Sequence, residues 1–126
     1  MIIYVSVGLG KTTYCKMHSN CCDADYYNYL HSNYSTYKEY VLEMSKLYDI
    51  VFINHVDGID LIDQVYLADN FDMIVERVTK RENNKFIPNK DVFIEEHKLF
   101  PNAVILKDNQ YLSDVFKEED YYVTNY

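Results

Sequence analysis

Short runs of apolar residues alternate along the chain with longer segments in which apolar residues recur every three or four positions. The runs are rich in β-branched residues and mostly continuous, which is typical of strands buried in a parallel sheet. They predict five strands, at residues 2–7, 21–25, 50–53, 64–68 and 103–106. Because both faces of such strands are apolar, we expect a parallel α/β sheet with helices on both sides.

The segments between the runs have the spacing of amphipathic helices. The clearest helix covers residues 37–48, with its apolar residues on one face, and Ser35 or Asn33 is expected to cap its start. Further helices are predicted at residues 11–17, 59–62, 88–99 and 111–116.

One more predicted helix, capped by Asn70, carries both arginines of the chain, Arg77 and Arg81. The two arginines are four residues apart, so they share a face of the helix, and we expect that face to point away from the apolar stripe. The predicted stripe consists of Phe71, Ile74, Val75 and Val78. The arginines either hold phosphate groups of a ligand or form ordinary ion pairs on a solvated face.

The first predicted strand leads into a segment that fits a phosphate-binding loop, from Val5 to Thr12 with the sequence VSVGLGKT. Glycines let backbone N–H groups approach phosphate oxygens, and the helix that follows directs its positive end at the anion. Lys11 would neutralise phosphate charge, and the Thr12 hydroxyl would bind Mg²⁺. The pattern is incomplete, because Val5 stands where the Walker A motif has its first glycine. The alternative is a strand–turn–helix corner with a chance Gly-Lys-Thr.

Two acids, Asp23 and Asp25, follow the second predicted strand. Ligands of parallel sheets bind beyond the carboxyl ends of the strands, so we expect these acids and residues 54–57 to converge on the loop at residues 8–12. A carboxylate there could accept the proton of a hydroxyl group or orient Mg²⁺ through water. Asp25 could equally cap the next helix, and strand alternation favours placing Asp23 on the opposite side.

Composition and charge narrow the classes of function. With 126 residues, 48% of them apolar or aromatic, the chain is expected to form one small domain with a sizeable core. A net charge of −8 argues against a broad nucleic-acid-binding surface but allows a local anion site. No apolar run approaches the ~18 residues of a membrane span, no signal peptide is evident, and the cysteine count is odd. We therefore expect a cytoplasmic protein without a membrane partner.

Taken together, these motifs resemble the small P-loop kinases of the nucleotide kinase and polynucleotide kinase type, and most of all compact phage-encoded members. The likeness rests on residues 8–13, on residues 23–27 and on residues 76–83, where an Arg-x3-Arg segment is similar to the lid helix of those kinases. The resemblance implies a three-layer P-loop NTPase-like domain over residues 1–117, with a parallel sheet of about five strands. Residues 118–126 then form an acidic, aromatic tail.

The resemblance also implies ligands and roles. ATP phosphates would be bound by Gly8, Leu9, Gly10, Lys11, Thr12 and Thr13. Mg²⁺ would be held by Thr12 and Asp23, and Asp25 would lie near the acceptor hydroxyl. Catalysis would also use Lys11, Arg77 and Arg81.

Residues 26–48 contain no arginine, although such kinases use one there to bind a monophosphate. A nucleoside monophosphate is therefore a less expected acceptor than a hydroxyl group, on a small molecule or on a nucleic-acid end, or than no acceptor at all. Two other interpretations stay open: a nucleotide-binding protein that sequesters a nucleotide signal with little or no turnover, and an inactive scaffold that binds a host protein. If the chain is phage-encoded, each would act in the host cytoplasm.

Overall fold

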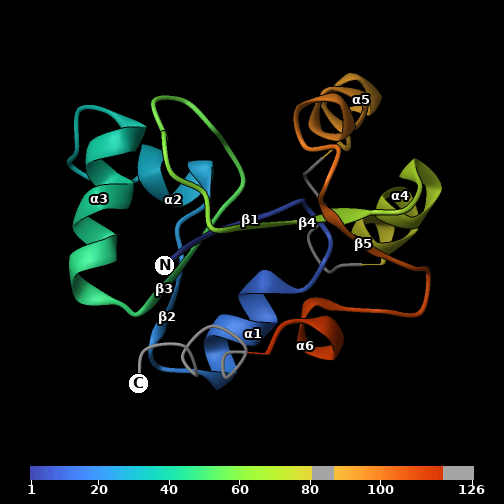
Figure 1. Ribbon diagram of the computed structural model, residues 1–126, viewed down its shortest axis with the longest axis horizontal. Coiled ribbons are helices and arrows are strands. Elements are labelled where there is room, and N and C mark those ends of the chain that lie inside the picture. The colour runs from blue at the N-terminus through green and yellow to red at the C-terminus, as the bar shows by residue number, and fades with distance from the viewer. Residues whose placement is uncertain (81–86, 118–126) are drawn as a thin grey trace.

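Five parallel strands form the centre of the molecule in the computed structural model, which describes residues 1–80 and 87–117 (Figure 1). The strands are β1 (Ile2–Val5), β2 (Cys21–Asp23), β3 (Ile50–Ile53), β4 (Gln64–Ala68) and β5 (Val104–Leu106). Their order across the sheet is β2-β3-β1-β4-β5, and every neighbouring pair is parallel. The predicted α/β class and the five strands are therefore confirmed.

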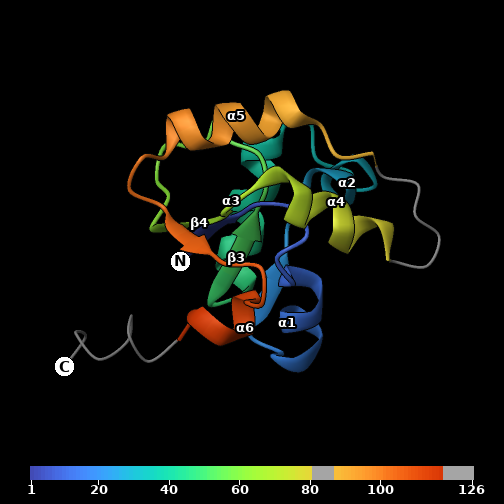
Figure 2. The ribbon, with the colours of Figure 1, turned by 90° about the vertical axis from the view of Figure 1, so that its right-hand side faces the viewer.

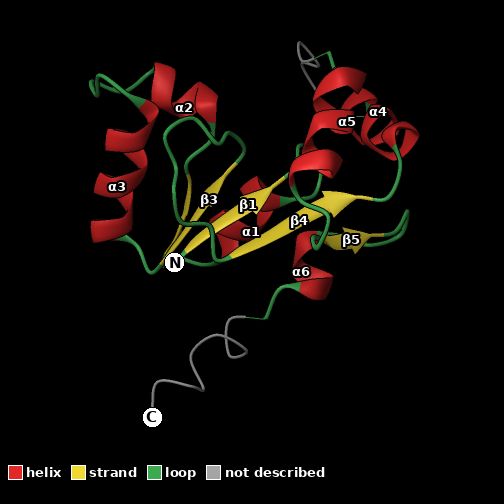
Figure 3. Ribbon diagram, turned by 45° about the horizontal axis from the view of Figure 1, so that its top comes forward, coloured by secondary structure: helices red, strands yellow, loops and turns green. Residues whose placement is uncertain are grey.

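Helices cover both faces of this sheet, giving three layers (Figures 2 and 3). One face packs against α1 (Lys11–Met17), α4 (Phe71–Thr79) and α6 (Leu112–Val115). The other face is covered by α2 (Tyr26–Leu30), α3 (Tyr37–Leu47) and α5 (Lys90–Leu99). Along β1 the side chains alternate between the two cores, with Ile3 and Val5 in the first and Ile2 and Tyr4 in the second.

Some local predictions differ from the structure. The first strand ends at Val5 rather than at residue 7, and α3 is capped by Thr36, which accepts a hydrogen bond from the Glu39 N–H, not by Ser35 or Asn33. Residues 59–62 form no helix. The segment stays non-helical because Asp63 at its end is bound to β1: its N–H donates to the Ile2 carbonyl and its carboxylate accepts the Ile2 N–H.

The buried side of α4 also differs from the predicted stripe. Met73, Ile74 and Val78 are buried, whereas Val75 is exposed and Phe71 is half-buried. Arg77 is one turn from Met73 and so lies toward the sheet rather than away from it. Arg81 and the predicted tail at residues 118–126 lie outside the described residues. None of the described helices has both the length and the apolar character needed to cross a membrane.

Candidate functional site

The loop between β1 and α1 bends at two glycines. Gly8 and Gly10 have φ angles of 83° and 94°, a region that residues with a Cβ rarely adopt. Gly10 is the N-cap of α1, and no side chain accepts a hydrogen bond there. The side chain of Leu9 is fully buried in the core, so only its backbone can face a ligand, and Thr13 is exposed.

Val5, at the position of the missing glycine, belongs to the sheet. It is the last residue of β1, is fully buried, and is paired in register with Tyr66 of β4. A β-branched residue suits such a position, and the positive φ angles of the loop fall only on Gly8 and Gly10. Valine in place of the first glycine of the motif is therefore compatible with the backbone conformation at residue 5.

Lys11, at the start of α1, faces the two acids that follow β2. Its Nζ lies 3.4 Å from Asp23 Oδ1 and 4.0 Å from Asp25 Oδ2, and all three side chains are largely buried. The Thr12 hydroxyl donates to Asp23 Oδ2 at 2.6 Å. The expected convergence of the acids on the glycine loop is thus observed, and the expectation that Asp23 lies on the opposite side is wrong. The reason is that β2 ends at Asp23, so strand alternation does not continue to Asp25.

Asp25 serves as a helix cap and as part of this cluster at once. Its carboxylate accepts a hydrogen bond from the Asn28 N–H at 2.7 Å, which caps α2. Burial raises the pKa of the Asp25 carboxyl, and the nearby Asp23 charge adds to the rise, while the Asn28 hydrogen bond and Lys11 oppose it. A carboxylate with a raised pKa is a stronger proton acceptor than an ordinary aspartate.

Asp23 has the properties of a ligand for a hard cation. Its Oδ1 is buried and accepts no hydrogen bond from the described residues, although it lies within ion-pair distance of Lys11. Mg²⁺ in phosphate sites is held by one or two protein oxygens together with waters and phosphates, rather than by a full protein cage. The Asp23 carboxylate and the Thr12 hydroxyl fit that donor set. Residues 1–80 and 87–117 contain no cluster of three or more His, Cys, Asp or Glu side chains that could hold a metal without such help.

Arg77 reaches the glycine loop from α4, but its guanidinium contacts carbonyl groups. It donates to the Gly8 carbonyl at 3.2 Å, to the Asp108 carbonyl at 3.0 Å and also to the Gln110 carbonyl. The guanidinium carbon lies 3.9 Å from the centre of the Tyr111 ring. Arg77 therefore fixes the loop to the segment before α6, and a contact of its own with phosphate stays a prediction.

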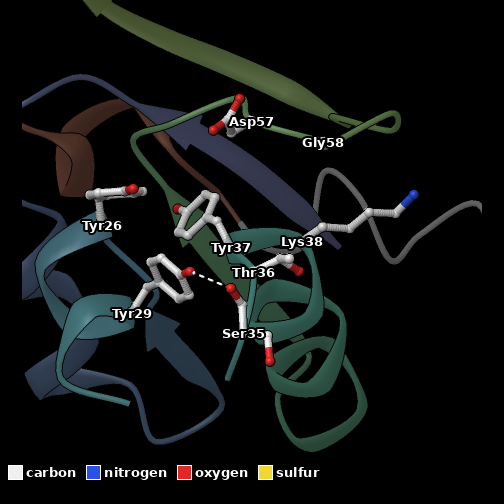
Figure 4. A pocket seen from close by; sticks show the side chains of 8 residues that line it. All are labelled: Tyr26, Tyr29, Ser35, Thr36, Tyr37, Lys38, Asp57 and Gly58. Carbon is white, nitrogen blue, oxygen red and sulfur yellow. Dashed lines mark hydrogen bonds between the residues drawn. The ribbon is translucent and has the colours of Figure 1, made fainter. Parts of the chain in front are cut away.

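A cleft of about 440 Å³ opens on the α2–α3 side of the acids. Its walls include the rings of Tyr26, Tyr29 and Tyr37, which face one another in Figure 4. Asp57 lies across from the rings, whereas the Lys38 ammonium extends away from them and pairs with Asp60. Tyr26, the residue after Asp25, lines the cleft, whereas Lys11, Asp23 and Asp25 do not, and the chemistry of the cleft is mainly aromatic.

Sequence reasoning missed one buried acid, Glu96. It lies on α5 and accepts hydrogen bonds from the Tyr4 hydroxyl at 2.6 Å and the Ser6 hydroxyl at 2.9 Å. A signal was present, because Glu96 shares a helical face with Phe93 and Phe100, at the i, i+3 and i+7 positions of an apolar stripe. Burial raises the pKa of its carboxyl, and the two hydroxyl donors oppose the rise.

The fold and the cluster define a three-layer α/β protein with lysine, threonine and two aspartates at the carboxyl edge of a parallel sheet. The chain matches no protein-family model, and no curated protein and no solved structure matches it significantly. What this edge does must therefore be argued from its own geometry.

Proposed function

We propose that the chain is a Mg²⁺-dependent phosphotransferase of the P-loop kinase type, which uses ATP and the loop at residues 8–13. The observation that carries the proposal is the position of Lys11. Its ammonium lies directly after a two-glycine bend and is held by two carboxylates, Asp23 and Asp25, with Thr12 bonded to one of them. A strand, a glycine loop, Lys-Thr and an acid from a nearby strand are the parts that phosphate binding requires.

The residues divide the work as follows. When nucleotide binds, the Lys11 ammonium leaves an aspartate and pairs with a phosphate oxygen. Both partners are anionic, so the ammonium keeps an ion pair throughout. Thr12 and Asp23 hold Mg²⁺, which when bound neutralises charge on the phosphates. Asp25, with its raised pKa, accepts the proton of the attacking hydroxyl group.

The acceptor fits the tyrosine-lined cleft. Three rings offer stacking surface, and the one lysine on the wall is already paired with Asp60. A neutral aromatic compound with a hydroxyl group, such as a nucleoside or a nucleic-acid 5′ end, suits this wall better than a monophosphate does.

One observation favours binding without turnover as a second candidate. The Arg77 guanidinium is held by three carbonyl groups, so it is not free to stabilise a migrating phosphoryl group. Under this alternative the chain binds the nucleotide tightly and releases it unchanged.

Radioactive phosphate transfer from ATP to a panel of nucleosides and oligonucleotide 5′ ends tests the proposal. Lys11→Ala should abolish transfer, whereas Lys16→Ala, an exposed residue on the same helix, should leave it unchanged. Transfer that survives in Lys11→Ala would contradict the proposal. Calorimetric binding of ATP with no product would favour the second candidate.

A further inference from the structure

A second cavity, of about 250 Å³, lies between α4, α5 and the glycine loop. The strands β1 and β4 are neighbours, but the connections that follow them run in opposite directions. The chain passes from β1 to β2 on one side of the sheet and from β4 to β5 on the other. Val7 after β1 and Phe71 after β4 both line the cavity. In open parallel sheets such a switch point beyond the carboxyl ends of the strands is where ligands bind.

Glu96, a residue that is 93% buried, is the one acidic residue among the described residues that line the cavity. No cation lies within ion-pair distance of Glu96 in residues 1–80 and 87–117; the Tyr4 and Ser6 hydroxyls supply its hydrogen bonds. A carboxylate accepts about four hydrogen bonds, so about two further donors can be accommodated. A buried anion with spare acceptor capacity favours a ligand that brings N–H donors.

The same cavity offers donors at its β3 edge. Asn54 accepts the Tyr26 N–H through Oδ1, and its Nδ2 bonds to none of the described residues. His55 accepts the Asp57 N–H at Nδ1, so in the neutral ring its Nε2 carries the proton and can donate. An acceptor on the ligand can therefore be bound on the side away from Glu96.

Apolar and aromatic side chains form the rest of the wall, including Val7, Phe71, Ile74 and Phe93. The volume is below the ~300–1,000 Å³ of sites for drug-sized ligands, so it suits a single planar ring system rather than a whole nucleotide. Stacking between apolar walls combined with hydrogen bonds to one edge is how proteins recognise a nucleobase outside a helix.

We propose that this cavity binds a heteroaromatic base that has two adjacent N–H donors beside a carbonyl oxygen, the arrangement on the edge of guanine. Glu96 accepts the two N–H groups, and Asn54 or His55 donates to the carbonyl oxygen. The inference does not depend on phosphate transfer, because it concerns the base alone. It gives the chain a guanine preference at a cavity that shares one wall residue, Tyr26, with the tyrosine-lined cleft.

Nucleosides without phosphate test this proposal independently of the glycine loop. In calorimetric titrations we expect guanosine to bind at least tenfold more tightly than inosine, which lacks the 2-amino donor, and than adenosine. Glu96→Gln should remove that preference, because an amide presents its own N–H groups to the ligand. Glu95→Gln, on the exposed side of the same helix, should retain it.

A second variant covers the case in which Glu96→Gln does not fold. Val92 lines the cavity, is 53% exposed and takes no part in the Glu96 hydrogen bonds, so we expect the larger side chain of Val92→Trp to occupy the cavity. Guanosine binding should fall at least tenfold in Val92→Trp. Equal affinities for the three nucleosides, or unchanged guanosine binding in either variant, would overturn the proposal.

Discussion

Thr12 donates its hydroxyl hydrogen to Asp23, with 2.6 Å between Oγ1 and Oδ2. The bond joins the first turn of α1 to the end of β2, and it leaves the buried Asp23 Oδ1 without a hydrogen bond from the described residues. The Asp23 carboxylate, whose Oδ1 has only the ion pair with Lys11 among the described residues, would be the charged protein ligand of a divalent cation at this position. Asp23 is therefore the residue at which dependence on Mg²⁺ is best tested.

Asp23→Asn should remove the Mg²⁺-dependent part of nucleotide binding, because an amide is a much weaker ligand for Mg²⁺ than a carboxylate. In the wild-type protein, ATP with Mg²⁺ at a hundredfold its dissociation constant should raise the free energy of unfolding by about 2.7 kcal/mol. In Asp23→Asn the stabilisation should be the same with Mg²⁺ as with EDTA. Asp72→Asn, an exposed acid on α4, is the control. A Mg²⁺ effect that persists in Asp23→Asn would exclude Asp23 as a ligand.

Arg77→Ala should destabilise the fold by about 1.5–3 kcal/mol, measured by urea unfolding, because carbonyls of two loops lose a charged donor. The stacking of the guanidinium on Tyr111 is lost as well. Lys80→Ala removes an exposed cation that pairs with Glu76 on the same helix, and it should change stability by less than about 0.5 kcal/mol. If the two variants were equally stable, the bracing role of Arg77 would be refuted.

Gly10→Ala should cost about 1–2 kcal/mol of stability, because φ is 94° there and the added Cβ would lie 3.3 Å from the Tyr111 ring. Gly58→Ala is a matched control: its φ is 72°, and its added Cβ would lie 3.3 Å from the Lys38 side chain, outside the glycine loop. Both variants should lose stability, but only Gly10→Ala should also lose ATP binding by calorimetry. Equal ATP affinity in the two variants would argue against the loop as the phosphate site.

Glu96 should make stability depend on pH in a direction opposite to that of a salt-bridged acid. Its folded-state pKa is raised above the ordinary ~4.3, so the folded protein holds this proton more tightly than the unfolded chain does. The associated stability is complete below ~4.3 and is lost as the pH rises through the folded-state pKa.

Glu96→Gln, which cannot ionise, should therefore gain stability relative to the wild type as the pH rises from 4 to 8. Urea unfolding of both proteins across that range measures the difference, and it cancels the contribution of every other titrating group. Glu95→Gln, which removes an exposed carboxylate from the same helix, is the control variant. A difference between Glu96→Gln and the wild type that does not vary with pH would show that the carboxyl has an ordinary pKa.

The pattern of apolar residues was sufficient to predict the sheet and most of the helices. Strands such as Ile50–Ile53 are continuous β-branched or aromatic runs, and caps such as Asn70 carry a side-chain acceptor before an amphipathic segment. The helix predicted at residues 59–62 is absent because the apolar residues of this segment pack as part of a loop bound to β1. Such a tertiary contact cannot be predicted from the spacing of apolar residues.

The predicted convergence of residues on one edge of the sheet is observed where chain order alone brings them together. Lys11, Asp23 and Asp25 follow the ends of strands, so parallel topology brings them to one edge. The predicted position of Arg77 is wrong because the buried face of α4 contains Met73 and not Val75, and Arg77 lies one turn from Met73. Burial of Glu96 could not be predicted from the sequence, because it depends on hydrogen bonds from the distant residues Tyr4 and Ser6.

The glycine loop is held by residues from the far end of the chain. Arg77 connects the Gly8 carbonyl to carbonyls in the segment before α6, and the Leu9 carbonyl accepts the Leu112 N–H at 2.7 Å. During synthesis, therefore, the loop cannot reach its final shape until α6 has left the ribosome, even though it is among the first segments translated. A nascent chain that ends before Leu112 would lack the hydrogen bond from the Leu112 N–H to the Leu9 carbonyl, and with it part of the support of the loop.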